Sequence, residues 1–161
     1  DVYKRQILYD FCKALHIPVT VYGHSTSGNS VELYSYAEFE SIDNDDKYRM
    51  MDIAARGSNR DGAALRFVAE QLVKRPEEVK ILILVSDGQP AAPGYYGSAA
   101  EEDLRGIKQE YRRKGVLFIA AAIGEDKQNI ERIYGDSFMD ITDLNQLPVK
   151  LTAAVKRHMR V

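Results

Sequence analysis

The chain has 161 residues, enough for one compact domain around a single hydrophobic core. It carries 22 basic and 24 acidic side chains, and this balance gives no general reason to expect nucleic acid or a membrane surface as partner. No apolar run approaches the roughly 20 residues of a membrane span, and no signal-peptide pattern opens the chain. Cys12 is the only cysteine, so an internal disulfide is excluded and a cytoplasmic, reducing setting is the simplest expectation.

The first six residues, Asp1 to Gln6, match the translation of the DNA end that transposase-based sequencing libraries attach to fragments. We therefore expect residues 1–6 to be an adapter scar and residues 7–161 to be a single, incomplete domain. The alternative is a native start of the first helix, which Tyr3 and Ile7 would suit. If the scar is real, native sequence begins near Ile7, inside a helix, and earlier elements are missing.

The first half of the chain alternates helical and strand patterns. In order, these patterns predict a helix over 7–16, a strand over 18–22, a polar loop over 23–30, a strand over 31–36 and a short helix over 45–55. The strand over 31–36 alternates apolar and polar residues, which is typical of a half-buried strand. We expect it to lie antiparallel at a sheet edge.

The second half continues the alternation after a polar loop over 57–62. The patterns predict helices over 62–74, 99–114, 130–134 and from 147, with strands over 81–85, 116–122 and 138–141. The strands over 81–85 and 116–122 are apolar without a break, as in a parallel sheet covered on both faces. The sequence therefore predicts a doubly wound α/β fold, mostly parallel, with helices on both faces and these two strands adjacent at its centre.

Two polar loops are expected at the carboxyl ends of the strands, where open α/β sheets bind ligands. Asp87 follows the strand over 81–85, and a carboxylate there is costly to bury unless a cation compensates its charge. Asn59 and Asp61 add an amide oxygen and a second carboxylate, and hard oxygen donors suit Mg²⁺. The alternative is that Asp87 caps a turn and that Asn59 or Asp61 caps the following helix.

The order of elements, together with Val85-Ser-Asp-Gly88 and Asn59-Arg-Asp-Gly-Ala-Ala-Leu65, resembles the von Willebrand factor A (vWA) family. The resemblance covers nearly all of the chain from Ile7 to Met159. In that family a metal-ion-dependent adhesion site (MIDAS) combines an Asp-x-Ser-x-Ser motif after the first strand, a Thr in a second loop and an Asp after the fourth strand. The resemblance implies that Asn59 takes the Thr position and Asp87 the final Asp. The first motif is absent, which implies that the first central strand lay upstream of residue 7.

An Asn-x-Asp-Gly loop in place of Thr resembles the bacterial vWA branch of the cobaltochelatase T subunit and the nitric oxide reductase activation protein. Those proteins work beside an AAA+ ATPase of the MoxR-like type. The resemblance implies a metal-ion-dependent protein-binding module and not an enzyme, with the ATPase and a client metalloenzyme as partners. Mg²⁺, held by Asn59, Asp61 and Asp87, is expected to bind only weakly in the truncated chain. The oxygens of Asn59 or Asp61 and those of Asp87 should then lie about 4–7 Å apart, one hydrated Mg²⁺ between them.

Four further residues are candidates for contacting a partner protein. They are His24 and Ser58, in the polar loops expected over 23–30 and 57–62, and Tyr95 and Tyr96, in a loop expected over 93–97 shortly after Asp87. Tyrosine is favoured at interfaces, although a tyrosine pair folded back onto the next helix is about equally reasonable, and His24 is also a common kind of surface residue.

Two other functions stay open at this point. One is a phosphoryl-transfer or hydrolase enzyme with Asp87 as nucleophile, but Gln89 stands where a haloacid-dehalogenase-like site needs a second acid, and no phosphate-binding loop is present. The other is a structural fragment without a competent site.

Overall fold

The computed structural model of the chain describes residues 9–40, 45–53, 57–86, 89–122 and 127–159. It divides into two units, residues 1–59 and 60–161, and each unit is considered by itself. The expected adapter scar and Asp87 lie outside the described residues. None of the described helices is both long and apolar enough to cross a membrane.

The first unit is built on an antiparallel hairpin. Strand β1 (Val21–Ser27) pairs with β2 (Ser30–Ala37), which confirms the antiparallel strand expected over 31–36. The loop expected over 23–30 is wrong, because β1 runs to Ser27 and only Gly28 and Asn29 form the turn. Gly28 has a φ of 57°, which glycine adopts without steric cost, and this permits a two-residue turn.

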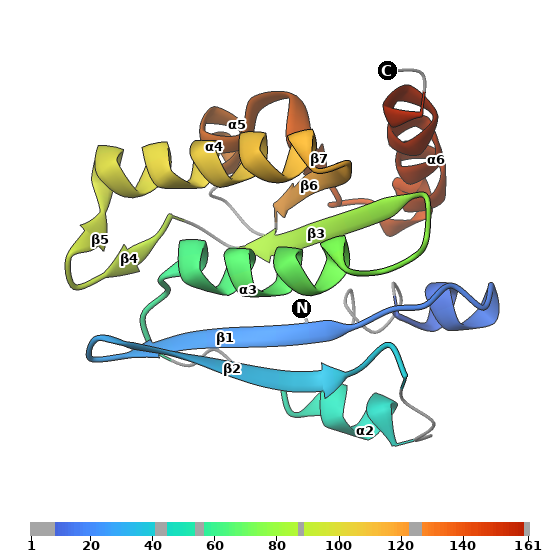
Figure 1. Ribbon diagram of the computed structural model, residues 1–161, viewed down its shortest axis with the longest axis horizontal. Coiled ribbons are helices and arrows are strands. Elements are labelled where there is room, and N and C mark those ends of the chain that lie inside the picture. The colour runs from blue at the N-terminus through green and yellow to red at the C-terminus, as the bar shows by residue number, and fades with distance from the viewer. Residues whose placement is uncertain (1–8, 41–44, 54–56, 87–88, 123–126, 160–161) are drawn as a thin grey trace. The chain divides into compact units, whose positions relative to one another are not determined.

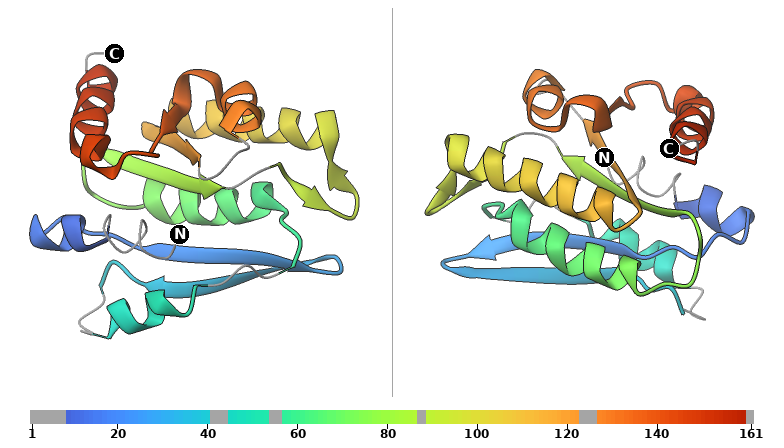
Figure 2. Two further views of the ribbon diagram at one scale, coloured as in Figure 1. Left: turned by 180° about the vertical axis from the view of Figure 1, so that it is seen from behind. Right: turned by 45° about the horizontal axis from the view of Figure 1, so that its top comes forward.

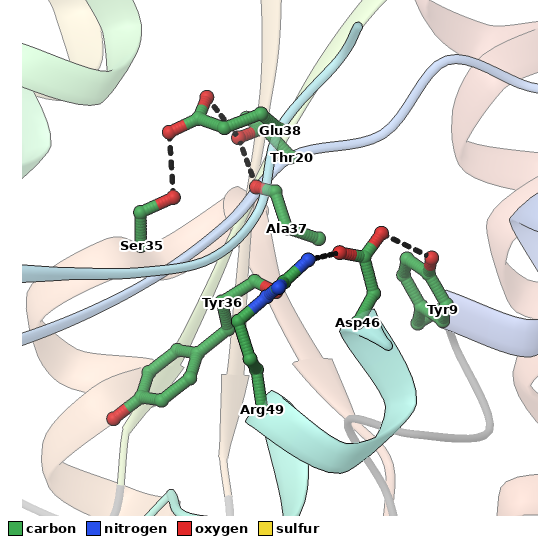
Figure 3. A network of polar contacts seen from close by, with 8 residues as sticks. All are labelled: Tyr9, Thr20, Ser35, Tyr36, Ala37, Glu38, Asp46 and Arg49. Atoms are coloured by element: carbon green, nitrogen blue, oxygen red, sulfur yellow. Dashed lines mark hydrogen bonds and ion pairs between the residues drawn. The ribbon is translucent and has the colours of Figure 1, made fainter. Parts of the chain in front are cut away.

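A buried polar network joins the two helical segments of this unit (Figure 3). Residues 9–14 are helical, and Tyr9 donates a 2.7 Å hydrogen bond to Asp46 at the start of α2 (Asp46–Met51). Asp46 is 2% exposed and also pairs with Arg49, whose Nε donates to the Tyr36 carbonyl oxygen. Burial and the neighbouring carboxylate raise the pKa of Tyr9 to about 12. The network therefore provides hydrogen-bond partners for the buried Asp46 carboxylate, beside an apolar cluster that includes Tyr36 and Met50.

The second unit contains a parallel sheet of three strands in the order β3-β6-β7 (Figure 1). In chain order its main elements are α3 (Asp61–Val73), β3 (Lys80–Ser86), β4 (Ala91–Ala92), β5 (Tyr95–Tyr96), α4 (Gly97–Arg113), β6 (Val116–Ala122), α5 (Lys127–Tyr134), β7 (Phe138–Asp140) and α6 (Leu147–His158). Two short 3₁₀ turns, η1 (Gly135–Ser137) and η2 (Leu144–Gln146), flank β7. Strand β3 lies in register beside β6, so the expected adjacent parallel pair and the α/β class are confirmed.

The core of this unit lies on the face of the sheet that α3, α4 and α5 cover. Figure 2 shows α3 and α4 side by side along it. Every second residue of the central strands joins this core, including Leu82, Leu84 and Phe118. Ile119 and Ala121, which point to the opposite face, are 3% and 1% exposed. Strand β6 is therefore buried on both faces, as its unbroken apolar run predicts.

The described strands do not form one continuous six-stranded sheet, which would have contradicted the expected absence of a central strand. They fall into the β1-β2 hairpin, the three-stranded sheet and the small β4-β5 hairpin. Among the described residues, β1 is hydrogen-bonded to β2, and β3 is hydrogen-bonded to β6.

Candidate functional site

The fold of the second unit places the start of α3 and the end of β3 at the same end of its sheet. Helix α3 begins at the end to which the arrow of β3 points (Figure 1), because it precedes that strand and runs antiparallel to it. Asp61 is the first residue of α3, and Ser86 is the last residue of β3. Asp87 follows Ser86 directly but lies outside the described residues, so its separation from Asp61 stays a prediction.

Asn59 belongs to the first unit, at the end of a loop that β1 holds in place. The Thr26 amide donates a 2.8 Å hydrogen bond to the Ser58 carbonyl oxygen, which makes an isolated bridge between the loop and β1. Thr26 is 6% exposed, and Gly57 lies against its carbonyl oxygen with a φ of 58°. Asn59 and Ser58 are half-buried, so the loop is fixed by backbone contacts on its amino-terminal side.

His24 does not lie in a loop, because β1 extends past it. It is half-buried and pairs with Leu33 across the hairpin. The hairpin turn begins only at Gly28. The loop location predicted for His24 is therefore wrong, while its proposed contact with a partner stays a prediction.

Asp61 opens α3 as a buried carboxylate that is 3% exposed. Its position in the first turn is favourable, because the free amides and the dipole of a helix N-terminus stabilise negative charge. The following residue is packed tightly: a Cβ on Gly62 would lie 2.3 Å from Asp103 Oδ2 and 2.4 Å from the Tyr95 hydroxyl, so a larger residue would require these side chains to shift. The first turn of α3 is thus in direct contact with side chains from β5 and α4.

Those two side chains form the centre of a polar cluster. The Tyr95 hydroxyl donates a 2.7 Å hydrogen bond to Asp103 Oδ2, and Arg66 Nη2 donates to Asp103 Oδ1 at the same distance. Burial raises the pKa of Tyr95, and the carboxylates of Asp103 and Asp61 raise it further. Tyr95 is therefore a neutral hydrogen-bond donor that ties β5 to α4 beside Asp61.

Tyr134, the last residue of α5, lies behind this cluster. It is 1% exposed, and its ring stacks on Phe118 of β6 with 5.5 Å between the ring centroids. Burial raises the pKa of Tyr134, and the charge of Asp61 adds to that rise. Within the described part of the chain, its hydroxyl has no hydrogen-bond partner. A buried hydroxyl left without a partner is uncommon in folded proteins.

The two predicted tyrosines of the β4-β5 hairpin differ in what they can do. Tyr95 is half-buried and turned toward Asp103, whereas Tyr96 is 69% exposed. Tyr96 is thus the side chain of the pair available to a partner. The predicted loop over 93–97 is instead a short hairpin in which Ala92 pairs with Tyr95 around Gly94, whose φ is 70°.

Sequence reasoning missed Asp103, Arg66 and Tyr134. Asp103 and Arg66 occupy positions on amphipathic helices where exposed charge is ordinary, and Tyr134 continues an apolar stripe. The glycine directly after Asp61 was the one available signal, because glycine in the first turn of a helix often allows another segment to pack closely against the backbone. Among the described residues, no three His, Cys, Asp or Glu side chains gather closely enough to hold a metal ion.

Comparison with known proteins places these loops in a family. A family model described as "Cobalamin biosynthesis protein CobT VWA domain" matches residues 44–159, a span that includes Asn59, Asp61 and Asp87. This chain belongs to the CobT VWA domain family. The expected vWA fold and its bacterial branch are thereby confirmed.

Relatives of this CobT-type vWA domain come from several bacteria. It is 30% identical over 123 residues to the uncharacterized protein YojO of Bacillus subtilis, which covers 73% of the chain and 19% of that protein. It is 34% identical over 97 residues to Protein NorD of Brucella suis, covering 58% of the chain and 15% of NorD. The uncharacterized protein PA0525 of Pseudomonas aeruginosa is 27% identical over 153 residues, covering 92% of the chain. The chain spans 25% or less of the length of each of these relatives.

An ion pair between α4 and α5 aligns the two helices that carry Asp103 and Tyr134 in this vWA domain. Glu101 of α4 is 7% exposed, and its carboxylate accepts hydrogen bonds from Nη1 and Nη2 of Arg132, with 2.6 Å between Arg132 Nη2 and Glu101 Oε1. Arg105 adds a longer contact of 3.2 Å. Arg132 holds the pKa of Glu101 below its ordinary value, so folding favours the ionised form.

Arg132→Gln should therefore lower stability most at neutral pH. Because the folded-state pKa of Glu101 is depressed, the stabilisation is fully present above the unfolded-state pKa of about 4.3 and is lost as pH falls through the folded-state value. In urea unfolding, the variant should have a clearly lower free energy of unfolding than wild type at pH 7, and this difference should be smaller at pH 3. Arg113→Gln, an exposed arginine at the end of α4, is the control and should change little at either pH. An equal loss at both pH values would mean that the ion pair is not the cause.

Proposed function

We propose that this chain is a metal-ion-dependent protein-binding module. Its site combines Asn59, Asp61 and Asp87 as oxygen donors for Mg²⁺, and a partner carboxylate completes the coordination. In this arrangement the metal bridges two proteins, and no residue of the chain acts as a nucleophile or general base.

The observation that carries the proposal is the buried Asp61 carboxylate at the end of the sheet where β3 leads to Asp87. The donor set fits Mg²⁺ in kind, because amide and carboxylate oxygens are the hard ligands that this cation prefers. It is small in number, since the described residues provide one buried carboxylate in this loop. A site with few protein donors keeps several waters and binds Mg²⁺ weakly, and it leaves positions open for a partner.

Family membership favours a partner of a particular kind. The CobT description names cobalamin biosynthesis, and NorD-type relatives share the same domain. We infer that the chain works with an AAA+ ATPase of the MoxR-like type during metal insertion or the maturation of a client metalloenzyme. The ATPase would supply the mechanical work, and the vWA site would hold the partner's carboxylate through the metal.

Binding between the purified chain and the MoxR-like ATPase of the same genome tests this proposal. At fixed Mg²⁺ and ATP, Asp61→Asn should weaken binding by about ten-fold, since the loss of one charged metal ligand is worth at least about 1.4 kcal/mol. Glu131→Gln is the matched acid-to-amide control, because Glu131 is exposed on α5. Biolayer interferometry measures both variants against wild type. Equal affinity for all three proteins would remove Asp61 from the partner site.

A further inference from the structure

The residues on either side of Asp61 both contact the β4-β5 hairpin. On one side, Arg60 Nη2 donates a 2.6 Å hydrogen bond to the Pro93 carbonyl oxygen in the hairpin turn. The Arg60 guanidinium also lies 5.8 Å from the centroid of the Tyr95 ring, within the range of a cation–π contact. On the other side, Gly62 lies directly beneath the hydrogen bond between Tyr95 and Asp103.

The hairpin is too short to hold this position through its own strands. Its ladder consists of two residue pairs, Ala91 with Tyr96 and Ala92 with Tyr95. An isolated two-stranded hairpin is marginally stable in water even when it is longer. Its placement therefore depends on the contacts that Arg60, Tyr95 and Asp103 make, which we call the hairpin anchor.

The hairpin anchor lies between a buried residue, Asp61, and an exposed one, Tyr96. Asp61 is buried at one end, and Arg66 of α3 holds the opposite oxygen of Asp103 in place. Tyr96 is 69% exposed at the other end, one residue beyond Tyr95. Arg60 joins the start of α3 to the hairpin, and the hydrogen bond between Tyr95 and Asp103 lies against Gly62. A displacement of the first turn of α3 should therefore displace the hairpin as well.

We propose that Arg60, Tyr95 and Asp103 are positioning residues that make the first turn of α3 and the β4-β5 hairpin move together. A ligand that orders the loop over 57–62, which we call the Asp61 loop, then also orders Tyr96. The inference rests on the proposed function only for the identity of that ligand, Mg²⁺. A partner protein that contacts Tyr96 should therefore bind with a different affinity when the Asp61 loop holds its ligand.

Hydrogen exchange without any metal tests the mechanical part. Tyr95→Phe keeps the aromatic ring but removes the hydroxyl that donates to Asp103. Amide exchange should become about ten-fold faster in both segments, 61–64 and 91–97, because a hydrogen bond to a charged acceptor is lost. Exchange in β6 should stay unchanged, which separates a local release from a global loss of stability. Tyr22→Phe, which removes a tyrosine–glutamate hydrogen bond in the first unit, is the matched control and should alter neither segment.

A fluorescence titration tests the transfer of ligand binding to the hairpin. The chain contains no tryptophan, so Tyr96→Trp introduces a single reporter at an exposed position. Added Mg²⁺ should change its emission in a saturable way, and Tyr95→Phe in the same background should abolish that change. Asp103→Asn, which keeps an oxygen acceptor for Tyr95, should retain part of it.

The outcomes separate this inference from the proposed function. Unchanged exchange in one of the two segments of Tyr95→Phe would overturn the inference. So would a change in the tryptophan emission on adding Mg²⁺ that Tyr95→Phe leaves intact. Faster exchange in both segments with no Mg²⁺ effect on any variant would support the mechanical unit and count against the proposed metal.

Discussion

Gly62→Ala is expected to destabilise the domain, whereas Gly106→Ala should stabilise it. A methyl group on Gly62 would meet Asp103 Oδ2 at 2.3 Å and the Tyr95 hydroxyl at 2.4 Å, both far below van der Waals contact. Forcing atoms into a packed site costs about 1–3 kcal/mol, and the hydrogen bond between Tyr95 and Asp103 would be broken in addition. The expected net loss is about 2 kcal/mol, because Gly62 lies in the first turn of α3, where alanine lacks the full propensity gain of a helix interior.

Gly106 is the matched control for that substitution. It is exposed within α4, and a Cβ there would meet no atom within 4 Å. Alanine should therefore add about 1 kcal/mol through helix propensity alone. Thermal unfolding of both variants beside wild type measures the difference. Two changes of the same sign would show that crowding at Gly62 is not what makes that position a glycine.

The apolar strands made much of the second unit predictable from sequence. The unbroken apolar runs over 81–85 and 116–122, separated by an expected helix over 99–114, predicted a parallel pair, and β3 lies parallel beside β6. Gly115 and Gly135 directly follow the helices expected over 99–114 and 130–134, and both have positive φ values, of 83° and 53°, as is typical of glycine at a helix end. In each case one local feature pointed to a single arrangement.

The first unit was less predictable, because its signals were short and ambiguous. The polar residues from Gly23 to Ser27 have the composition of a loop, yet they form strand because each pairs with a residue of β2. Strand propensity is weak beside such cross-strand pairing. A two-residue Gly-Asn turn was the signal that could have set the hairpin correctly.

The candidate site was predictable as a set of loops but not as a cluster of side chains. Asp61 was identified from the residue types around it, and the family model includes its loop. Asp103, by contrast, lies far along the chain from Gly62 and reaches it only because α4 packs beside α3. Contacts of that kind depend on helix packing, which the pattern of one sequence does not specify.

If a divalent cation binds at Asn59, Asp61 and Asp87, Mn²⁺ should bind there as well. Mn²⁺ substitutes for Mg²⁺ at oxygen sites and broadens nearby nuclear magnetic resonance signals even when it binds weakly. In the wild-type chain, low Mn²⁺ should broaden the amides of Asn59, Asp61 and Gly62 first. Val116 should stay sharp, because it begins β6 about 20 Å from the carboxyl end of that strand.

Excess Mg²⁺ should restore the broadened signals, and Asp87→Asn should prevent the broadening, with Glu131→Gln behaving like wild type. We expect selective broadening of residues 59–62 that disappears in Asp87→Asn. Broadening that centres on other acidic residues, or that persists unchanged in Asp87→Asn, would contradict it.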